Sequence, residues 1–323
     1  MIGFSNAVNT NPAHYSILNP TYQSYRGDIE NINLLTEIMN SHQVEVVFHL
    51  AAQSLVRVSY TDPCETYRVN VMGSLSLMRA IQLSPSVRCL INITTDKVYE
   101  NEEIEKAYAE EDRLGGYDMY SSSKACVEIL TDSFVRSFFS DRKITVSTAR
   151  AGNVIGGGDW AKDRLLPDLM SSAGANTSAI IRNPFSIRPW QHVLEPLSGY
   201  LLLGQRMMEQ QDEVSGPWNF GPEKSQCVSV GNVVEILKSV WPEIKAETLG
   251  SENKQPHEAK ILMLSFEKAR VKLGWSPIWN LSETILHTAH WYKEFFHSGK
   301  SIALQQIERY IEDATAKNSV WTK

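Results

Sequence analysis

The sequence lacks long apolar runs and has few cysteines. No stretch approaches the roughly 18 consecutive apolar residues of a membrane-spanning helix, and no charged leader precedes an apolar segment at the start of the chain. Neither a membrane span nor a signal peptide is therefore predicted. None of the four cysteines in 323 residues belongs to a C-x-x-C pair. A chain of this length buries a sizeable core without disulfides, so we expect reduced thiols and a cytoplasmic protein.

Positive charge is also in deficit, and two common catalytic motifs are missing. Lys and Arg number 31 against 37 Asp and Glu, which gives a net charge of -6. This balance argues against nucleic acid or a membrane surface as the partner. The eight histidines show no H-E-x-x-H or similar spacing, so no metal site is predicted. The G-x-S-x-G elbow of serine hydrolases does not occur either.

What the sequence does contain is an alternation of short apolar runs and longer amphipathic ones. Val44–Leu50 is nearly continuous and rich in β-branched residues, as expected of a strand buried on both faces. The same pattern predicts strands at Arg88–Thr94 and Lys143–Arg150. Helical spacing predicts helices at Arg68–Leu83 and Tyr120–Phe139. Strands that alternate with helices predict an α/β fold with a parallel, doubly wound sheet.

The composition changes after Arg150. The glycine-rich stretch Gly152–Trp160 predicts a loop, and the arginine, proline and aromatic residues of Arg182–Val193 predict an ordered loop. From about Val230 onward helices dominate, and the helix Asn280–Phe296 begins at a capping residue. We therefore expect a sheet-building first half and a smaller, more helical second part with interleaved boundaries.

Tyr120 and Lys124 form a Y-x-x-x-K pair on a predicted helix. Positions i and i+4 share one helix face, and an ammonium beside a phenol favours the phenolate, which lowers the tyrosine pKa from its usual value near 10. Tyr120 would then serve as a base near neutral pH. The same spacing also arises by chance on helix surfaces, so the pair alone does not establish a catalytic site.

Thr95, Asp96 and Lys97 come directly after the strand predicted at Arg88–Thr94. In a doubly wound sheet the carboxyl ends of strands line the active cleft, and a hydroxyl, a carboxyl and an amine there offer acid–base chemistry. A polar turn after a strand is the common alternative for an isolated T-D-K. Together with the Tyr/Lys pair, the cleft interpretation is favoured.

Weaker motifs complete the set. H-L-A-A-Q-S (His49–Ser54) follows a predicted strand, and its two alanines let a flat ring or a ribose approach the backbone; a plain helix start is the alternative. In Gly27–Ile29, the carboxylate of Asp28 has the chemistry to meet an adenine amine. Arg188 offers a fixed fork of donors to phosphate, and Asn153 offers an amide to a pyrophosphate oxygen. A buried structural role is equally open for both.

In this order, the motifs resemble the extended short-chain dehydrogenase/reductase family. They run G-D-I, H-L-A-A-Q, N-V-x-G, T-D-K, Y-x-x-x-K, R-x-x-N-V and R-P-W-x-x-V, and they cover nearly the whole chain. Within the family the chain is similar to the nucleotide-sugar 4,6-dehydratases, which place an acid and a base directly after the threonine. Most of them have Asp-Glu there, whereas the CDP-glucose branch has Asp-Lys, as at Asp96–Lys97 here. The segments 150–168 and 181–200 also resemble that branch.

The resemblance implies NAD as the cofactor and the net loss of water from CDP-glucose. Tyr120, activated by Lys124, would remove the O4 proton while a hydride leaves C4, with Thr95 hydrogen-bonding the same oxygen. Lys97, as a neutral amine, would take the C5 proton. Asp96 would protonate the departing C6 hydroxyl, which requires a raised carboxyl pKa. The hydride then returns to C6, and CDP-4-dehydro-6-deoxyglucose would enter deoxysugar synthesis for surface polysaccharide such as O-antigen.

The resemblance also assigns domains and binding residues. Residues 1–155 are expected to form an NAD-binding Rossmann-like domain, and residues 156–323 a nucleotide-sugar-binding domain interleaved with it. Cofactor contacts are implied for Asp28, Ile29, Leu50, Ala51, Ala52, Asn70, Tyr120 and Lys124, and substrate contacts for Asn153, Arg164, Leu165, Arg188 and His257. Family members pair through the Tyr/Lys helix and the preceding long helix, so a homodimer is implied.

Three alternatives stay open. A nucleotide-sugar 4-epimerase shares the Tyr/Lys pair but needs no acid and base after the threonine, so Asp96–Lys97 speaks against it. A different sugar nucleotide is the second alternative, because nothing in the residues themselves selects cytidine. The third is an inactive relic, or a binding subunit that retains only the nucleotide-sugar site.

One part of the resemblance is missing, namely the strand, G-x-x-G-x-x-G turn and helix that seat a dinucleotide pyrophosphate on a helix N-terminus. The first 60 residues contain only Gly3 and Gly27, and neither lies in a glycine-rich turn. M-I-G-F instead resembles the family's second strand. We therefore expect an N-terminally truncated domain that lacks roughly 30–35 residues. Weak NAD binding, strands without their neighbour and poor solubility would follow.

Overall fold

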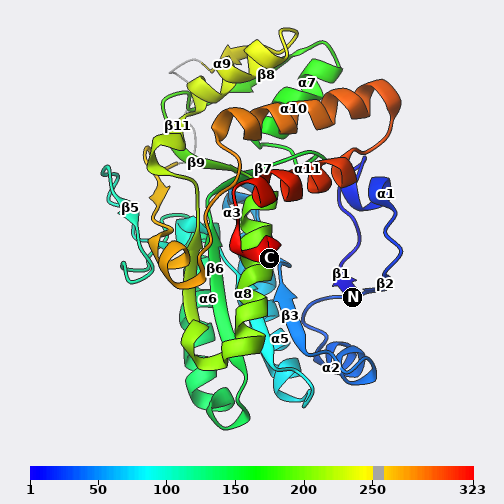
Figure 1. The fold of residues 1–323 in the computed structure, drawn as a ribbon, viewed down its shortest axis with the longest axis vertical. Coiled ribbons are helices and arrows are strands. Elements are labelled where there is room, and N and C mark those ends of the chain that lie inside the picture. The colour runs from blue at the N-terminus through cyan, green and yellow to red at the C-terminus, as the bar shows by residue number, and fades with distance from the viewer. Residues whose placement is uncertain (250–257) are drawn as a thin grey trace.

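The computed structural model describes residues 1–249 and 258–323 (Figure 1). At its centre is a four-stranded sheet in the order β10-β6-β4-β3, in which every neighbouring pair is parallel. Its strands are β3 (Val46–His49), β4 (Cys89–Ile93), β6 (Thr145–Ala151) and β10 (Gly216–Phe220). The three strands predicted in the first half are all present, and the α/β fold with a parallel sheet is confirmed. Strand β10 comes from the second half of the chain, so the two halves interleave.

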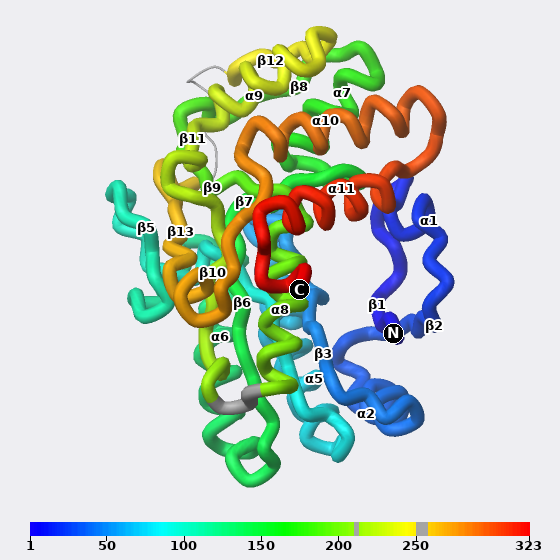
Figure 2. The backbone as a smooth tube through the Cα atoms, in the orientation of Figure 1, coloured from blue at the N-terminus to red at the C-terminus, as the bar shows by residue number. Residues whose placement is uncertain are grey.

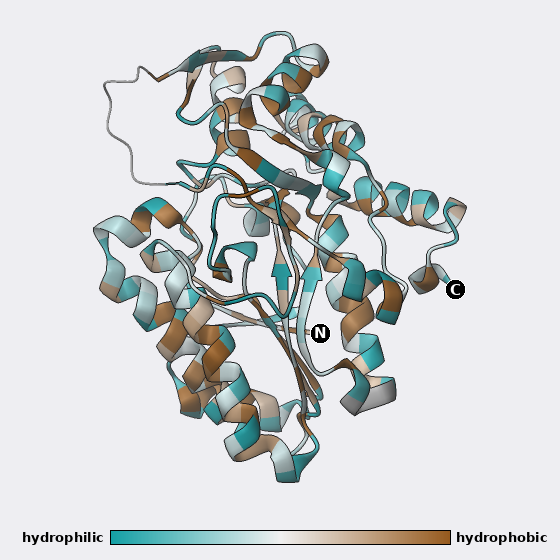
Figure 3. Ribbon diagram, turned by 90° about the vertical axis from the view of Figure 1, so that its left-hand side faces the viewer, coloured by the Kyte–Doolittle hydropathy of each residue, from teal (hydrophilic) through white to brown (hydrophobic). Residues whose placement is uncertain are grey.

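Helices cover both faces of this sheet. Adjacent residues of β4 point to opposite faces: Leu90 joins the apolar cluster under α2 (Ile32–Ser41), α5 (Gly73–Gln82) and α6 (Met119–Phe134), whereas Ile91 joins the cluster under α8 (Leu194–Gln210). Both residues are fully buried, which explains the continuous apolar run in the sequence. Apolar residues gather along the sheet and on the helices beside it (Figure 3). The predicted helix 68–83 begins as a π-helical turn, η1 (Arg68–Met72), and the predicted helix 120–139 ends as another, η3 (Val135–Phe139).

The N-terminal strands stand apart from the main sheet. Strands β1 (Ile2–Ser5) and β2 (Gln23–Arg26) pair in parallel with each other, and α1 (His14–Leu18) lies between them in sequence. The main sheet ends at β3, whose Phe48 is 36% exposed, with Leu50 just beyond it at 54%. Within residues 1–249 and 258–323 no strand pairs with the outer edge of β3, and Figure 2 shows β1 and β2 beyond that edge. Such an edge leaves apolar side chains and backbone groups without a neighbour.

The second half builds a separate layer above the carboxyl ends of the main sheet (Figure 1). Its helices are α7 (Leu165–Gly174), α9 (Val230–Val240), α10 (Leu281–Ser298) and α11 (Ala303–Ala316). Its strands form two small sheets, β11 (Cys227–Ser229) with β9 (Ile187–His192) and β7 (Asn153–Ile155), and β12 (Lys245–Thr248) with β8 (Ser178–Ile181). Asn280 caps α10, and Glu283 completes a capping box. The shorter elements are α3 (Val56–Thr61), α4 (Pro63–Tyr67), β5 (Ala107–Tyr108) and β13 (Met263–Leu264).

Two predicted loops are partly wrong. Ile187–His192, expected in an ordered loop, is the central strand β9, and Asn153–Ile155, expected in a glycine-rich loop, is β7. The proline in β9 concealed it, because proline has no N–H for a sheet ladder. The ladder between β7 and β9 begins only at Trp190, so Pro189 is not part of that ladder and owes β7 no N–H. No helix in the described residues combines the length and apolar character that crossing a membrane requires.

Candidate active site

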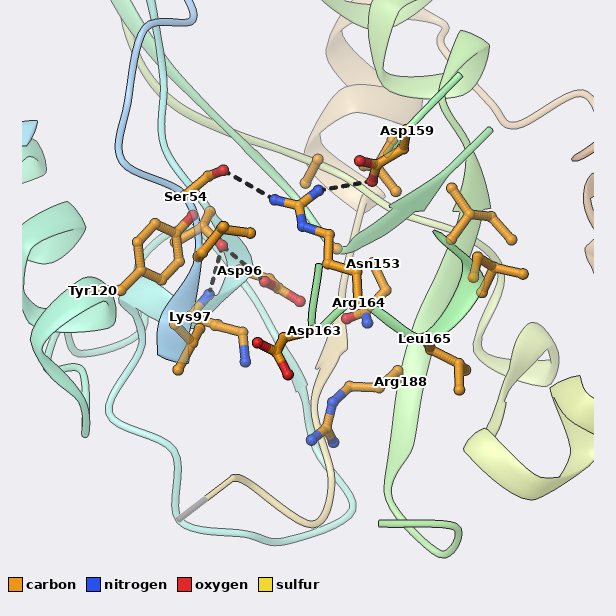
Figure 4. A pocket seen from close by; sticks show the side chains of 18 of the residues that line it. Ser54, Asp96, Lys97, Tyr120, Asn153, Asp159, Asp163, Arg164, Leu165 and Arg188 are labelled. Carbon is orange, nitrogen blue, oxygen red and sulfur yellow. Dashed lines mark hydrogen bonds and ion pairs between the residues drawn. The ribbon is translucent and has the colours of Figure 1, made fainter. Parts of the chain in front are cut away.

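A cavity of about 390 Å³ lies between the carboxyl ends of β4 and β6 and the layer built by the second half. This volume is in the usual range for a small-molecule site. Eight of the predicted site residues line it: Thr95, Asp96, Lys97, Tyr120, Asn153, Arg164, Leu165 and Arg188 (Figure 4). The structure thus brings together the predicted acid–base residues and the predicted substrate residues, which are up to 93 positions apart in the sequence.

The turn after β4 presents the acid. The Thr95 side chain caps the short 3-10 turn η2 (Asp96–Val98), and its hydroxyl donates to Asp96 Oδ1 at 3.0 Å. Asp96 is 2% exposed, and its Oδ2 has no hydrogen-bond partner among the described residues. Burial raises the Asp96 pKa, while Lys97 and the Thr95 hydroxyl oppose the rise. A carboxyl that stays protonated to higher pH than usual fits the role of a proton donor.

Lys97 is the neighbouring candidate base. Its side chain lines the cavity beside Asp96 (Figure 4). Its backbone N–H donates a hydrogen bond to Thr95 Oγ1 at 3.4 Å. Within the described chain its amine forms neither a hydrogen bond nor an ion pair, so it is available to a ligand in the cavity.

Tyr120 and Lys124 lie on consecutive turns of α6, which begins at the capping residue Asp118. Tyr120 lines the cavity, whereas the Lys124 amine does not line it and donates to the backbone oxygen of Ile93 at 2.9 Å. Burial raises the Tyr120 pKa to about 12, against a lowering by Thr95. Our prediction that the Tyr120 pKa is lowered is therefore wrong in direction: burial has the largest effect on it, and the Lys124 amine is held by the Ile93 carbonyl.

Two arginines line the substrate side of the cavity, and each of them faces a carboxylate. Arg188 is buried on β9, donates to the Ile187 backbone oxygen at 2.8 Å and faces Glu258 at 3.9 Å. Arg164 precedes α7 and bridges Ser54 Oγ at 3.0 Å and an Asp159 carboxylate oxygen at 3.2 Å. These guanidinium groups line a cavity that a diphosphate could enter, and planar forks of donors suit phosphate oxygens.

Asn153 and Leu165 complete the predicted substrate wall. Asn153 is the first residue of β7, opposite Trp190 of β9, and Leu165 is the first residue of α7. His257, the remaining predicted substrate residue, lies outside the described residues.

The predicted cofactor residues lie outside this cavity, at the ends of β2 and β3. Asp28 follows β2, and its carboxylate accepts hydrogen bonds from Glu30 N at 2.9 Å and Arg68 Nη1 at 3.2 Å. The contact with Glu30 and the positive charge of Arg68 lower its pKa. Ile29 packs against Gly73 so closely that a Cβ there would lie 2.5 Å from Ile29 Cγ2.

The loop after β3 carries Leu50, Ala51 and Ala52, of which the first two are exposed. Asn70 holds this loop: its buried amide accepts from Gln53 N at 2.8 Å and donates to Ser123 Oγ at 2.9 Å. The Asp28 carboxylate at the end of β2 and the small or apolar side chains after β3 have the chemistry to meet the adenine and ribose of a dinucleotide, although the two strands belong to different sheets. Between β1 and α2, the described residues contain no glycine-rich turn for the pyrophosphate.

Comparison with known proteins assigns the chain to a family. The sequence profile of the GDP-mannose 4,6 dehydratase family matches residues 4–288. The chain belongs to this family. The CDP-glucose 4,6-dehydratase of Salmonella typhimurium is 43% identical over 322 residues, which cover 97% of this chain and 89% of that protein.

Solved structures share the family fold. A dTDP-glucose 4,6-dehydratase from Bacillus anthracis in complex with NAD superposes with a TM-score of 0.74 at 21% identity, covering 92% of this chain and 89% of that one. A UDP-glucuronic acid 4-epimerase from Bacillus cereus, in complex with UDP-glucuronic acid and NAD, gives a TM-score of 0.77 at 20% identity over 91% of both chains. At this identity the likeness shows the fold alone.

Several cavity residues were not predicted from the sequence, among them Ser54, Arg57, Asp163 and Tyr200. Ser54 ends the H-L-A-A-Q-S motif and Arg57 follows it in α3, so extending that motif by one turn would have found both. Asp163 pairs with Arg57 at 3.6 Å, a contact that sequence separation conceals. Tyr200 lies on the buried face of α8 and has the pattern of an ordinary core residue.

Proposed function

We propose that this chain dehydrates CDP-D-glucose to CDP-4-dehydro-6-deoxy-D-glucose, with NAD as the cofactor. The observation that carries the proposal is the meeting, in one cavity, of a buried acid and an unpaired amine on η2 with the phenol of Tyr120. Elimination of water needs a base for the carbon-bound proton and an acid for the departing hydroxyl in addition to the tyrosine, whereas epimerisation at C4 does not. The choice of CDP-glucose is supported by the Salmonella relative, which is 43% identical and has that name.

The residues divide the chemistry among them. NAD, when bound beside Tyr120, supplies the hydride acceptor and donor. Tyr120 takes the proton from O4, and the Thr95 hydroxyl hydrogen-bonds the same oxygen. The resulting 4-ketone acidifies C5–H, Lys97 accepts that proton, and Asp96 gives its own to the C6 hydroxyl, which leaves as water. Return of the hydride to C6 and of the Lys97 proton to C5 would then give the 4-dehydro-6-deoxy product, and exchange with solvent would restore the protons of Tyr120 and Asp96. Asp28, Ile29, Leu50, Ala51, Ala52, Asn70 and Lys124 are proposed to hold the cofactor.

The nucleotide diphosphate is proposed to lie along the wall of the cavity that carries Arg164 and Arg188. Asn153, Arg164, Leu165 and Arg188 line the same cavity as the acid and base, so the sugar and its diphosphate have room side by side. Arg164 would exchange Asp159 for phosphate. His257 is proposed as a further contact.

We also propose a homodimer that forms through α6 and the preceding long helix. Residues 1–155 are proposed as the cofactor domain and residues 156–323 as the substrate domain. The proposed role is cytoplasmic, in deoxysugar synthesis for surface polysaccharide.

The proposal is tested with the purified chain and a panel of CDP-glucose, dTDP-glucose, UDP-glucose and GDP-mannose. NAD is supplied in excess, because the described residues offer no glycine-rich turn for its pyrophosphate. CDP-glucose is expected to give the alkali chromophore of a 4-keto-6-deoxy sugar, with one solvent deuterium at C5 in deuterium oxide, because Lys97 exchanges its protons with solvent. Preference for another nucleotide would reassign the substrate, and glucose–galactose interconversion without the chromophore would establish the epimerase instead.

Replacement of Lys124 by methionine is expected to raise stability while it reduces turnover. Burial lowers the Lys124 pKa to about 8, so the folded protein holds this proton less tightly than the unfolded chain does. The charged amine therefore costs stability below about pH 8, and wild-type stability rises between pH 8 and 10.4 as the proton leaves. At pH 7, Lys124→Met is expected to gain about 1–2 kcal/mol after the lost hydrogen bond to Ile93 is deducted.

Urea unfolding at pH 7 and pH 9.5 measures this gain, which is expected to shrink at the higher pH. Lys272→Met, at an exposed lysine on the turn before Gly274, is the matched control and is expected to change neither stability nor its pH dependence. A Lys124→Met protein that is equally destabilised at both pH values would contradict the assignment of a buried, costly charge.

A further inference from the structure

Glu128 is a buried carboxylate behind the active-site cavity. It lies on α6 four residues after Lys124, so the two side chains share one helix face. Its side chain is 4% exposed and does not line the cavity. It accepts four hydrogen bonds, from Thr94 Oγ1 at 2.5 Å, Thr148 Oγ1 at 2.5 Å, Arg150 Nε at 2.8 Å and Arg150 Nη2 at 2.9 Å.

Arg150 extends this network across the sheet. Its Nη1 donates to the Tyr99 hydroxyl at 2.7 Å and to the Glu110 backbone oxygen at 3.2 Å. The guanidinium carbon lies 4.9 Å from the centroid of the Tyr99 ring. The Tyr99 hydroxyl in turn donates to Asn219 Oδ1 at 2.8 Å. Arg150, Tyr99 and Asn219 are each at most 2% exposed, so these bonds are shielded from water.

The two ends of the network bracket the acid–base turn. Thr94 immediately precedes Thr95–Val98, and Tyr99 immediately follows it. Both ends are thereby tied to one carboxylate–guanidinium pair, formed by Glu128 on α6 and Arg150 on β6. A buried ion pair adds little net stability, because desolvation offsets its attraction. A network in which each charged group has several partners does, however, fix geometry.

We propose that the Glu128–Arg150 pair is a positioning device that holds the turn Thr95–Val98 in register with Tyr120 and Lys124. Neither residue touches the cavity. The kinetic consequence rests on the proposed function, whereas the structural consequence rests on the hydrogen bonds alone.

The carboxylate also acts on the charge of Lys124. Within the described chain, the titratable groups that influence this amine are Glu128 on the same helix and His49 at the end of β3. Burial keeps His49 neutral, with a pKa of about 3, and Glu128 opposes the burial that lowers the Lys124 pKa. Without the Glu128 charge, Lys124 loses its proton at lower pH. A purely structural role of Glu128 would not move this titration.

The test compares Glu128→Gln with Glu128→Asp. The amide loses the charge and turns an NH2 toward the Arg150 and threonine donors, so we expect kcat to fall about 10–100-fold with KM within about 3-fold, as a misplaced catalytic group predicts. The alkaline decline of kcat is expected to begin at lower pH. Glu128→Asp keeps the charge, but its side chain is one methylene shorter and no longer reaches all of the hydrogen-bond partners. It is therefore expected to lower kcat while retaining the wild-type pH dependence.

Amide hydrogen exchange gives a readout that needs no substrate. Exchange at residues 95–99 is expected to rise in Glu128→Gln and in Tyr99→Phe, which removes only the hydroxyl link. Glu195→Gln is the matched control: this buried carboxylate accepts from Ile278 N at 2.9 Å, Trp279 N at 2.7 Å and the Tyr310 hydroxyl at 2.7 Å, away from the cavity. It is expected to lower stability without changing exchange at residues 95–99.

The outcomes separate the positioning role from the function. Wild-type exchange at residues 95–99 in Tyr99→Phe, or a folded Glu128→Gln with wild-type kcat and pH profile, would overturn the positioning role. Failure of the proposed function shows instead as a wild-type protein without dehydratase turnover. In that case the exchange comparison between Tyr99→Phe and Glu195→Gln still decides the positioning role.

Discussion

Replacement of Asp96 by asparagine is expected to lower turnover about 10²–10⁴-fold, the usual contribution of a positioned general acid. Asparagine preserves the shape of the side chain, and the Thr95 hydroxyl still finds an oxygen acceptor, so folding is expected to be unaffected. What is lost is the proton that Asp96 gives to the C6 hydroxyl. Because burial raises the Asp96 pKa, the wild-type acid keeps its proton to higher pH than an ordinary carboxyl, as a proton donor requires.

Isotope exchange distinguishes this role from simple damage to the site. Lys97 is retained in Asp96→Asn, so the variant is expected to exchange C5–H of the bound ketone for solvent deuterium without losing the C6 hydroxyl. Lys97→Met is expected to lose both exchange and elimination. Asp112→Asn, at a surface carboxylate paired with Lys106, is the control and is expected to behave as wild type. Wild-type elimination by Asp96→Asn would assign the acid to another group.

The architecture of the first half was predictable because its strands are apolar on both faces. In β4 (Cys89–Ile93), every residue is buried or nearly so, and α5 and α6 each present an apolar face to the sheet. The apolar run of the strand and the helical spacing of the apolar residues can be read from the sequence alone. The parallel pairing of these strands was also implied, because short apolar runs separated by helices build parallel sheets.

Strand β9 was not predictable by the same means. Its arginine, proline and glutamine are all buried, and their partners come from distant parts of the chain, such as the Phe220 backbone oxygen for Gln191 Nε2 at 2.9 Å. Whether polar side chains such as these are buried depends on their tertiary contacts, and the local sequence pattern does not reveal those contacts.

The sequence predicted eight of the residues that line the cavity, but it did not predict the pKa shift of Tyr120. Motifs placed Thr95, Asp96 and Lys97 at a strand end, and the fold brought them to Tyr120 as expected. The direction of the Tyr120 pKa shift was wrong because sequence spacing reveals that Lys124 is near but not where its amine points. Likewise, the pairing of Glu128 with Arg150 joins residues 22 positions apart, and no spacing rule connects them.

Replacement of Tyr120 by phenylalanine is expected to lower turnover about 10²–10⁴-fold, because no other group takes the O4 proton. The phenol is buried and faces the cavity, so the folded state is expected to tolerate the loss of its hydroxyl. Unlike Asp96→Asn, this variant stops before the ketone forms, and it is therefore expected to show neither C5 deuterium exchange nor the alkali chromophore. Tyr108→Phe, which loses a hydroxyl that accepts from Glu102 N at 2.9 Å and donates to Asn101 Oδ1 at 3.2 Å outside the cavity, is the matched control. C5 exchange by Tyr120→Phe at the wild-type rate would show that another group forms the ketone, and the proposed division of roles would then be wrong.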